Sequence, residues 1–134
     1  MVGNDELIQE AASLVSPLRK GDSLFADVGC ALLSRDGRIF KGVCASAGSF
    51  TFCAEKIAIG AMLTEGGYLI DKIVSVWKDD SGRVFVIPPC GSCRQLMLDI
   101  EKHNLDAQVI LDKDKVVSLK GLLPYHDWWK KIDF

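Results

Sequence analysis

The sequence predicts an α/β protein of three layers, in which a mixed sheet of about five strands has helices on both faces. Two observations predict this class. Segments with the apolar spacing of helices alternate along the chain with short apolar runs that are typical of strands. At 134 residues, the chain is long enough for one hydrophobic core but short of two. We therefore expect residues 1–134 to form a single domain.

The first part of the chain predicts a helix followed by a hairpin. The helix is expected to begin with a cap at Asn4 and to end before Pro17. Residues 18–23 have the composition of a polar connector. Two apolar runs at 28–33 and 38–43 surround a short polar turn that ends in glycine. Such a pair of runs is typical of a β-hairpin.

The middle of the chain predicts two further helices separated by strands. Residues 44–51 are mostly small and are expected to form a loop. A helix is expected over 53–63, and Gly66 and Gly67 after it stop the helix. Strands are expected at 69–78 and 83–87. A third helix is expected from Cys90 to about His103, because the two prolines before it cannot continue a strand.

The last part of the chain predicts two short strands, at 108–111 and 116–119, around a charged turn. An aromatic tail completes the chain, with Tyr125, Trp128 and Trp129 close together. Aromatic residues of this kind are enriched at subunit interfaces. From the residues alone we expect both tryptophans to be buried between subunits.

Three cysteines and one carboxylate lie in two short segments, each at the expected start of a helix. Cys53 and Glu55 form a C-x-E motif, and Cys90 and Cys93 form a C-x-x-C motif directly after a proline. Residues three apart at a helix start lie on one face, so both sulfurs of the second motif can reach one ion. Helix N-termini favour thiolates, which are ligands that zinc prefers. The sequence therefore predicts a zinc site at Cys53, Cys90 and Cys93.

Three protein ligands are typical of a catalytic zinc site, which keeps one coordination position open. Glu55 is then the candidate catalytic residue, as a carboxylate that takes a proton from water and passes it to a substrate. The alternative is a closed structural site, for which Cys44 is the candidate fourth ligand. We also expect Lys56 and Arg94 to hydrogen-bond to the cysteine sulfurs and to offset their charge.

Charge and composition restrict the partners. The net charge is −2 and the sequence pI is about 5.6, whereas polynucleotide-binding surfaces are usually basic. We therefore expect a small-molecule substrate and no nucleic acid polymer. No apolar run approaches the length of a membrane span. The five cysteines without a secretory signal favour metal binding in the cytoplasm over disulfides.

On these motifs the sequence resembles the cytidine deaminase superfamily, in its short homotetrameric branch, and is most similar to blasticidin S deaminases. The resemblance extends over most of the chain, including 28–33, 36–43 and 122–124. It implies the cytidine-deaminase-like fold, one Zn²⁺ per subunit on the three motif cysteines, and Glu55 as proton shuttle. It also implies a homotetramer whose subunits help to complete each other's pockets, and an aromatic tail that lines a pocket, its own or a neighbour's.

The chain departs from this family where the substrate would bind. Cytidine deaminases carry Asn and Glu that hold the ribose hydroxyls, at positions that correspond here to Cys44 and Ser46. The resemblance therefore implies a hydrolytic deaminase of a cytosine-type nucleoside or analogue, such as a modified cytidine or a blasticidin S-like compound. Two alternatives remain: a deaminase of another amino-heterocycle, of purine or triazine type, or an inactive, zinc-stabilised binding protein on the same scaffold.

Overall fold

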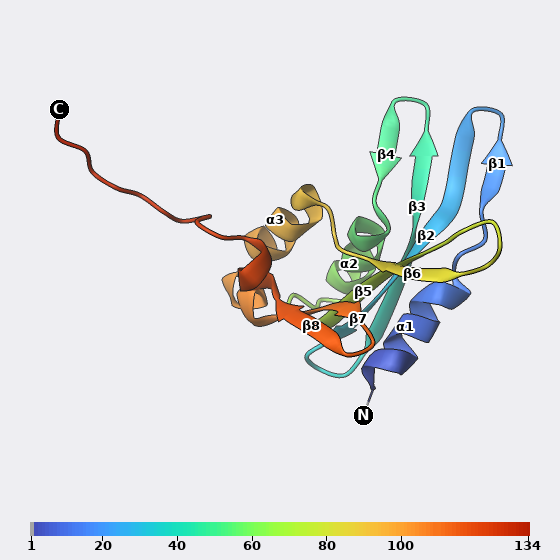
Figure 1. The fold of residues 1–134 in the computed structure, drawn as a ribbon, viewed down its shortest axis with the longest axis horizontal. Coiled ribbons are helices and arrows are strands. Elements are labelled where there is room, and N and C mark those ends of the chain that lie inside the picture. Colours follow the sequence, from blue (N-terminus) through green and yellow to red (C-terminus); the bar gives the residue numbers. More distant parts are fainter. Residues whose placement is uncertain (1) are drawn as a thin grey trace.

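The computed structural model describes residues 2–134, which form one mixed sheet with helices on both faces (Figure 1). The helices are α1 (Asn4–Ser13), α2 (Ala54–Thr64) and α3 (Gly91–Ile100), with 3-10 helices η1 (Lys102–Asp106) and η2 (Leu119–Leu122). The strands are β1 (Leu18–Lys20), β2 (Ser23–Ser34), β3 (Ile39–Ala47), β4 (Phe50–Phe52), β5 (Ile70–Lys78), β6 (Val84–Ile87), β7 (Gln108–Asp112) and β8 (Lys115–Ser118).

The sheet has eight strands rather than the expected five or so. Its main path runs β4-β3-β2-β5-β7-β8, while β1 pairs with β2 and β6 pairs with β5. Only the β5–β7 pair is parallel among the pairs of the described chain, so the sheet is mixed as predicted.

Two of the additional strands come from segments that the sequence analysis assigned to connections. Residues 18–23 contain β1, and residues 44–51 continue β3 and begin β4. All residues of β1 and β4 are exposed. Their side chains therefore do not alternate between core and solvent, and this alternation is the pattern that indicates a strand in a sequence. These strands extend the hairpins beyond the body of the protein (Figure 1).

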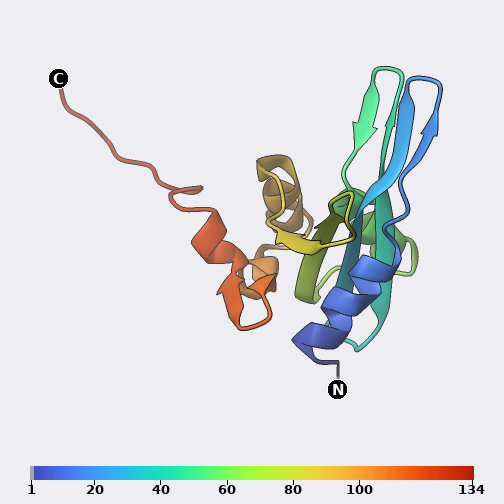
Figure 2. The ribbon, with the colours of Figure 1, turned by 45° about the vertical axis from the view of Figure 1, so that its right-hand side comes forward.

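The hydrophobic core lies in two layers, one on each face of the sheet. On one face α1 packs Leu7 and Ala11 against β2 and β5, and on the other α2 packs Ala58 and Met62 against β2 and β3. Figure 2 shows α1 and α2 on opposite sides of the central strands. The predicted three-layer arrangement is therefore confirmed.

The ends of two helices differ from the prediction. Gly3, not Asn4, is the cap of α1, and the Asn4 side chain instead accepts a hydrogen bond of 3.1 Å from Lys72 Nζ. The helix expected to reach about His103 stops at Ile100, because Glu101 adopts an extended conformation and its carboxylate accepts a bond from the His103 N–H. The chain then continues as η1.

A glycine sets the distance between β3 and α2. A Cβ atom at Gly42 would lie 2.5 Å from the backbone nitrogen of Ala58 and 2.7 Å from the carbonyl oxygen of Ala54. No side chain other than hydrogen fits in this space. The first turns of α2, which follow Cys53, therefore rest directly on the backbone of β3.

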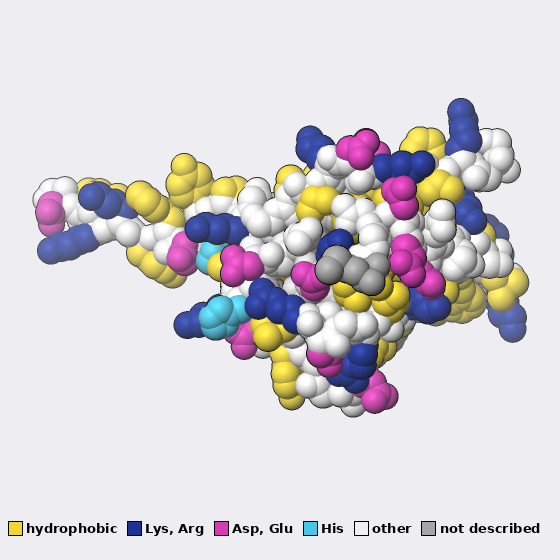
Figure 3. Space-filling model, turned by 90° about the horizontal axis from the view of Figure 1, so that it is seen from below, with side chains coloured by type: hydrophobic (Ala, Val, Ile, Leu, Met, Phe, Trp, Pro, Cys, Tyr) yellow, Lys and Arg dark blue, Asp and Glu magenta, His cyan; other side chains and the backbone are white. Residues whose placement is uncertain are grey.

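The chain beyond η2 extends away from the body (Figure 1). Its aromatic side chains are exposed: Trp129 has 91% of its surface accessible and Trp128 has 65%. Figure 3 shows hydrophobic side chains along this extension, and acidic and basic side chains interspersed over the rest of that face. Within residues 2–134, no helix has the length and apolar character needed to cross a membrane.

Candidate metal and catalytic site

Two helix N-termini bring the three motif cysteines together. Cys53 is the cap residue of α2, Cys90 is the cap residue of α3, and Cys93 lies in the first turn of α3. The sulfurs of Cys53 and Cys90 are 3.6 Å apart, and those of Cys90 and Cys93 are 3.3 Å apart. All three sulfurs lie within 4.8 Å of one another. Segments that are far apart in the sequence thus supply one compact group of thiols.

The spacing of these sulfurs fits a tetrahedral metal ion. Zinc–sulfur bonds of about 2.3 Å at tetrahedral angles place neighbouring sulfurs about 3.8 Å apart. The distances of 3.6 and 3.3 Å require only small adjustments to reach that value. A set of three thiolates is also the donor chemistry that zinc prefers over hard cations such as magnesium.

The three thiols differ in their acidity. Burial raises the pKa of the Cys93 thiol, and burial and the hydrogen bond to Cys90 raise that of Cys53. Burial also opposes charge on Cys90, but the backbone N–H of Cys93, which donates to its sulfur, and its hydrogen bonds with the Cys93 and Cys53 thiols hold the pKa of Cys90 below its usual range. Cys90, at the start of α3, is thus the thiol of this group whose pKa is lowered, whereas the pKa values of Cys53 and Cys93 are raised.

Glu55 lies beside this group. It is the second residue of α2 and only 5% exposed. Glu55, Cys53 and Cys90 line the same cavity, which has a volume of about 210 Å³. The structure therefore places a buried carboxylate and two of the three thiols around one space that a small molecule can enter.

Cys44 also lines this cavity, but it does not belong to the group of three sulfurs. Its thiol donates to Asp27 Oδ1 at 2.6 Å, and the Val28 N–H donates to its sulfur at 3.3 Å. The hydrogen bonds of Cys44 are thus made away from the cysteine group. This arrangement argues against Cys44 as the fourth ligand of a closed site.

The expected hydrogen bonds from basic side chains to sulfur are not found among the described residues. Lys56 Nζ donates instead to Ser92 Oγ at 2.7 Å, and this bond links the starts of α2 and α3. Arg94 Nε donates to the carbonyl oxygen of Pro89 at 2.8 Å. Both basic residues therefore fix the segments that carry the cysteines rather than the sulfurs themselves.

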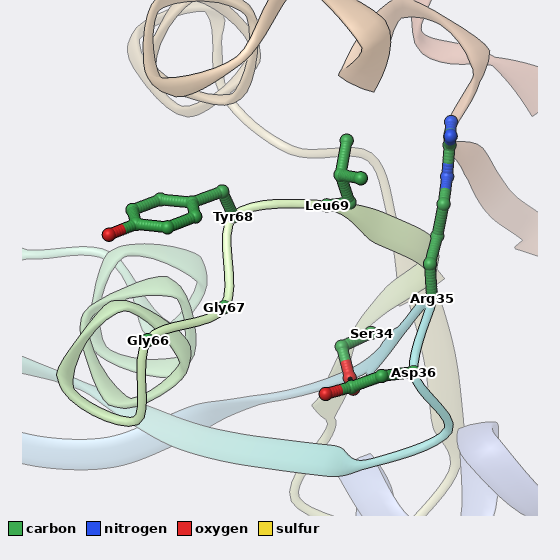
Figure 4. A pocket seen from close by; sticks show the side chains of 7 residues that line it. All are labelled: Ser34, Arg35, Asp36, Gly66, Gly67, Tyr68 and Leu69. Atoms are coloured by element: carbon green, nitrogen blue, oxygen red, sulfur yellow. Dashed lines mark hydrogen bonds between the residues drawn. The ribbon is translucent and has the colours of Figure 1, made fainter.

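A larger cavity, of about 420 Å³, lies at the far end of α2 between residues 34–36 and 66–69 (Figure 4). Figure 4 shows Tyr68 pointing away from Leu69 and Arg35, while the side chains of Ser34 and Asp36 lie against each other. The polar groups are also already paired. Ser34 donates to Asp36, and the Arg35 guanidinium donates to the carbonyl oxygen of His103 at 3.0 Å. The smaller cavity at the cysteines is the candidate site.

The family of the chain is decided by residues 4–106. They match the family model described as the cytidine and deoxycytidylate deaminase zinc-binding region. The chain belongs to this family. The family predicted from the two cysteine motifs is therefore confirmed. The prediction of a deaminase-type enzyme with a zinc-binding region is confirmed with it, at the level of the family.

Individual relatives agree with the family. The chain is 35% identical over 100 residues to blasticidin-S deaminase of Bacillus cereus, which covers 70% of each chain. It is 37% identical over 75 residues to cytidine deaminase of Halalkalibacterium halodurans. This match covers 54% of this chain and 54% of that relative, about half the length of each. The crystal structure of cytidine deaminase from Mycobacterium leprae superposes with a TM-score of 0.72 at 27% identity, covering 92% of this chain and 99% of that one.

Sequence reasoning missed two contributors to the candidate site. Asp27, which bonds to Cys44, was not singled out, and Phe52 was assigned to no element between the expected loop at 44–51 and the expected helix, although it belongs to β4 and lines the cavity. A signal for the first existed, since Asp27 places a carboxylate directly before the apolar run 28–33. A charged residue at the edge of a buried strand usually has a specific partner.

Proposed function

We propose that this chain is a zinc-dependent hydrolytic deaminase, which replaces the amino group of a cytosine-type ring by oxygen and releases ammonia. The substrate class comprises cytosine nucleosides and their analogues, including modified cytidines and compounds like blasticidin S. The observation that supports this most directly is the buried carboxylate of Glu55 in the same cavity as Cys53 and Cys90. A purely structural metal site would have no use for a carboxylate in that position.

The residues divide into two roles. Cys53, Cys90 and Cys93 would hold the zinc ion, which when bound makes water more acidic and therefore a better nucleophile. Glu55 would accept one proton of the attacking water and deliver it to a ring nitrogen. It would then take the second proton, from the hydroxyl group formed on the ring carbon, and pass it to the departing amine. The cavity walls would exclude bulk water and hold the flat ring beside this carboxylate.

The test is ammonia release by the zinc-loaded protein from cytidine, cytosine, blasticidin S and an aminopurine. Glu55→Gln keeps the size of the side chain but cannot carry the proton. It is expected to lower kcat at least a hundredfold, within the range of general acid–base catalysis, while its zinc content stays unchanged. Turnover that persists in this variant would contradict the role of Glu55.

Two other functions are separated by the same panel. Turnover of the aminopurine alone would indicate a deaminase of another amino-heterocycle. No turnover of any compound by protein with a full zinc content would indicate a zinc-stabilised binding protein on this scaffold. The feature that favours the latter is Cys44, because its thiol already makes its hydrogen bonds within the protein.

The proposal extends to assembly. We infer a homotetramer of single-domain subunits, each with one zinc ion. Large apolar side chains are exposed in the isolated chain, such as Phe50 at 68% and Trp129 at 91%, and the tilted aromatic pair of Trp77 and Phe85 lies at the surface. Exposed apolar surface of this extent is typical of subunit contacts. Light scattering and metal analysis of the same sample would give the subunit number and the zinc stoichiometry.

A cytoplasmic location completes the proposal. The five cysteines are all free thiols in the structure, and three of them form the candidate metal site. Thiols persist in reducing compartments, whereas oxidising compartments favour disulfides. Localisation of a tagged protein by cell fractionation would test it.

A further inference from the structure

A bulge in β2 surrounds Cys44 at the wall of the candidate site. In the pairing of β2 with β3, Phe25 is opposite Ala45 and Gly29 is opposite Val43. The three residues 26–28 therefore face the single residue Cys44. Ala26 has a φ of 61°, a left-handed conformation that costs a non-glycine residue energy. Its carbonyl oxygen is fixed by a 2.9 Å bond from the Ser16 N–H.

This bulge directs two groups at the sulfur of Cys44. The Asp27 carboxylate accepts the thiol hydrogen at 2.6 Å, and the Val28 N–H donates to the sulfur at 3.3 Å. A thiol has one weak donor and a weak acceptor. Both are used within the protein, so Cys44 has no hydrogen to offer to a molecule in the cavity.

The surroundings of Cys44 in the cavity are apolar as well. Val28, Phe52, Ile87 and Pro88 line the same space, while the reactive groups are Glu55, Cys53 and Cys90. Thr51 also lines it, but its hydroxyl lies 3.5 Å from that of Ser46, within hydrogen-bonding distance. Apart from the exposed Thr51, the wall at Cys44 therefore gives a hydroxyl group of a substrate no hydrogen-bond donor, and burying an unpaired hydroxyl is costly.

We propose that Asp27 is a positioning residue for substrate specificity: it directs the hydrogen of the Cys44 thiol away from the cavity, so that the site favours a ring whose substituent carries no hydroxyl at this wall. The inference rests on the proposed deaminase function and refines its substrate class. The favoured substrates are amino-substituted pyrimidine rings with a hydrogen or an alkyl group where nucleosides carry a hydroxylated sugar.

The test compares kcat and KM of the zinc-loaded protein for 1-methylcytosine and cytidine. The variants are Asp27→Ala, which releases the thiol hydrogen, and Asp27→Asn, which keeps an oxygen acceptor of the same reach. The wild type is expected to have the higher kcat/KM for 1-methylcytosine. Asp27→Ala is expected to lower KM for cytidine relative to 1-methylcytosine by about three- to tenfold, the effect of one added hydrogen bond. Asp27→Asn should keep the preference of the wild type.

A second measurement separates positioning from a general loss of structure. Dissociation constants of uridine and 1-methyluracil, the expected products, are measured by calorimetry with the same three proteins and require no turnover. A loosened cavity would weaken both ligands alike, whereas the proposal requires their ratio to change in Asp27→Ala.

The outcomes distinguish this inference from the function on which it rests. A wild type that prefers cytidine, or an Asp27→Ala variant with an unchanged ratio in both measurements, would overturn the role of Asp27 and leave the deaminase proposal intact. No turnover of any substrate by protein with full zinc content would contradict the deaminase proposal, and the inference would fail with it.

Discussion

Substituting alanine for Gly42 is expected to weaken zinc binding through the backbone of α2. The added Cβ atom would lie 2.5 Å from the Ala58 nitrogen, where ordinary contacts begin at 3.4 Å, so α2 must move by about 0.9 Å. This shift is large compared with the tolerance of about 0.2 Å for metal–ligand distances. We expect the dissociation constant for zinc to rise about tenfold or more. Overpacking should also reduce the free energy of unfolding by about 1–3 kcal/mol.

Gly29→Ala provides the matched control. A Cβ atom at Gly29 would meet the carbonyl oxygen of Ala11 in α1, on the face of the sheet opposite α2. It should cost similar stability and leave zinc affinity unchanged. Affinity is measured by competition with a chromogenic chelator under reducing conditions, and stability by urea unfolding of the zinc-free proteins. Equal zinc affinities of the two variants would refute the reasoning.

Three further predictions concern stability and are measured by urea unfolding. Asn104→Ala should cost roughly 3 kcal/mol, because the fully buried amide bonds three backbone groups, and a variant as stable as the wild type would contradict this. Gly60→Ala should add about 0.5–1 kcal/mol to α2, since no atom lies within 4 Å of the new Cβ, and a loss of stability would count against it. Hydrogen bonds to the Asp79 carboxylate, above all from the Ser81 hydroxyl and then from Arg83, hold the pKa of Asp79 below its usual range. The stabilisation by Asp79 should therefore be complete above its unfolded pKa of about 3.9 and be lost as pH falls through its lower folded pKa. The free energy of unfolding of Asp79→Asn should consequently be lower than that of the wild type near neutral pH and equal to it in acid.

The layers of the fold and the group of three cysteines could be predicted because each rests on a local pattern. Helical spacing marked α1 and α2, and the two cysteine motifs at expected helix starts identified the thiols that the structure brings together. The exposed strands β1 and β4 could not be predicted in this way. Their residues are held by pairing with β2 and β3, which is a property of the tertiary structure.

The environment of Cys44 was beyond prediction for a different reason. The sequence places Asp27 and Cys44 seventeen residues apart, and nothing local shows that a bulge will join them. The same holds for Lys56, whose proximity to the cysteines suggested a bond to sulfur but whose amine reaches Ser92. Side-chain partners across elements depend on register and helix orientation, which a single sequence does not specify.

The close approach of the Cys90 and Cys93 sulfurs also determines how the protein must be handled. At 3.3 Å the two atoms need little movement to join covalently, and the more acidic Cys90 is the one that attacks oxidised thiol reagents. Chelation in air would therefore lock this pair and prevent reloading, whereas chelation in the presence of a phosphine reductant would be reversible. Preparations that lose their metal during storage should be restored by reduction before zinc is added back.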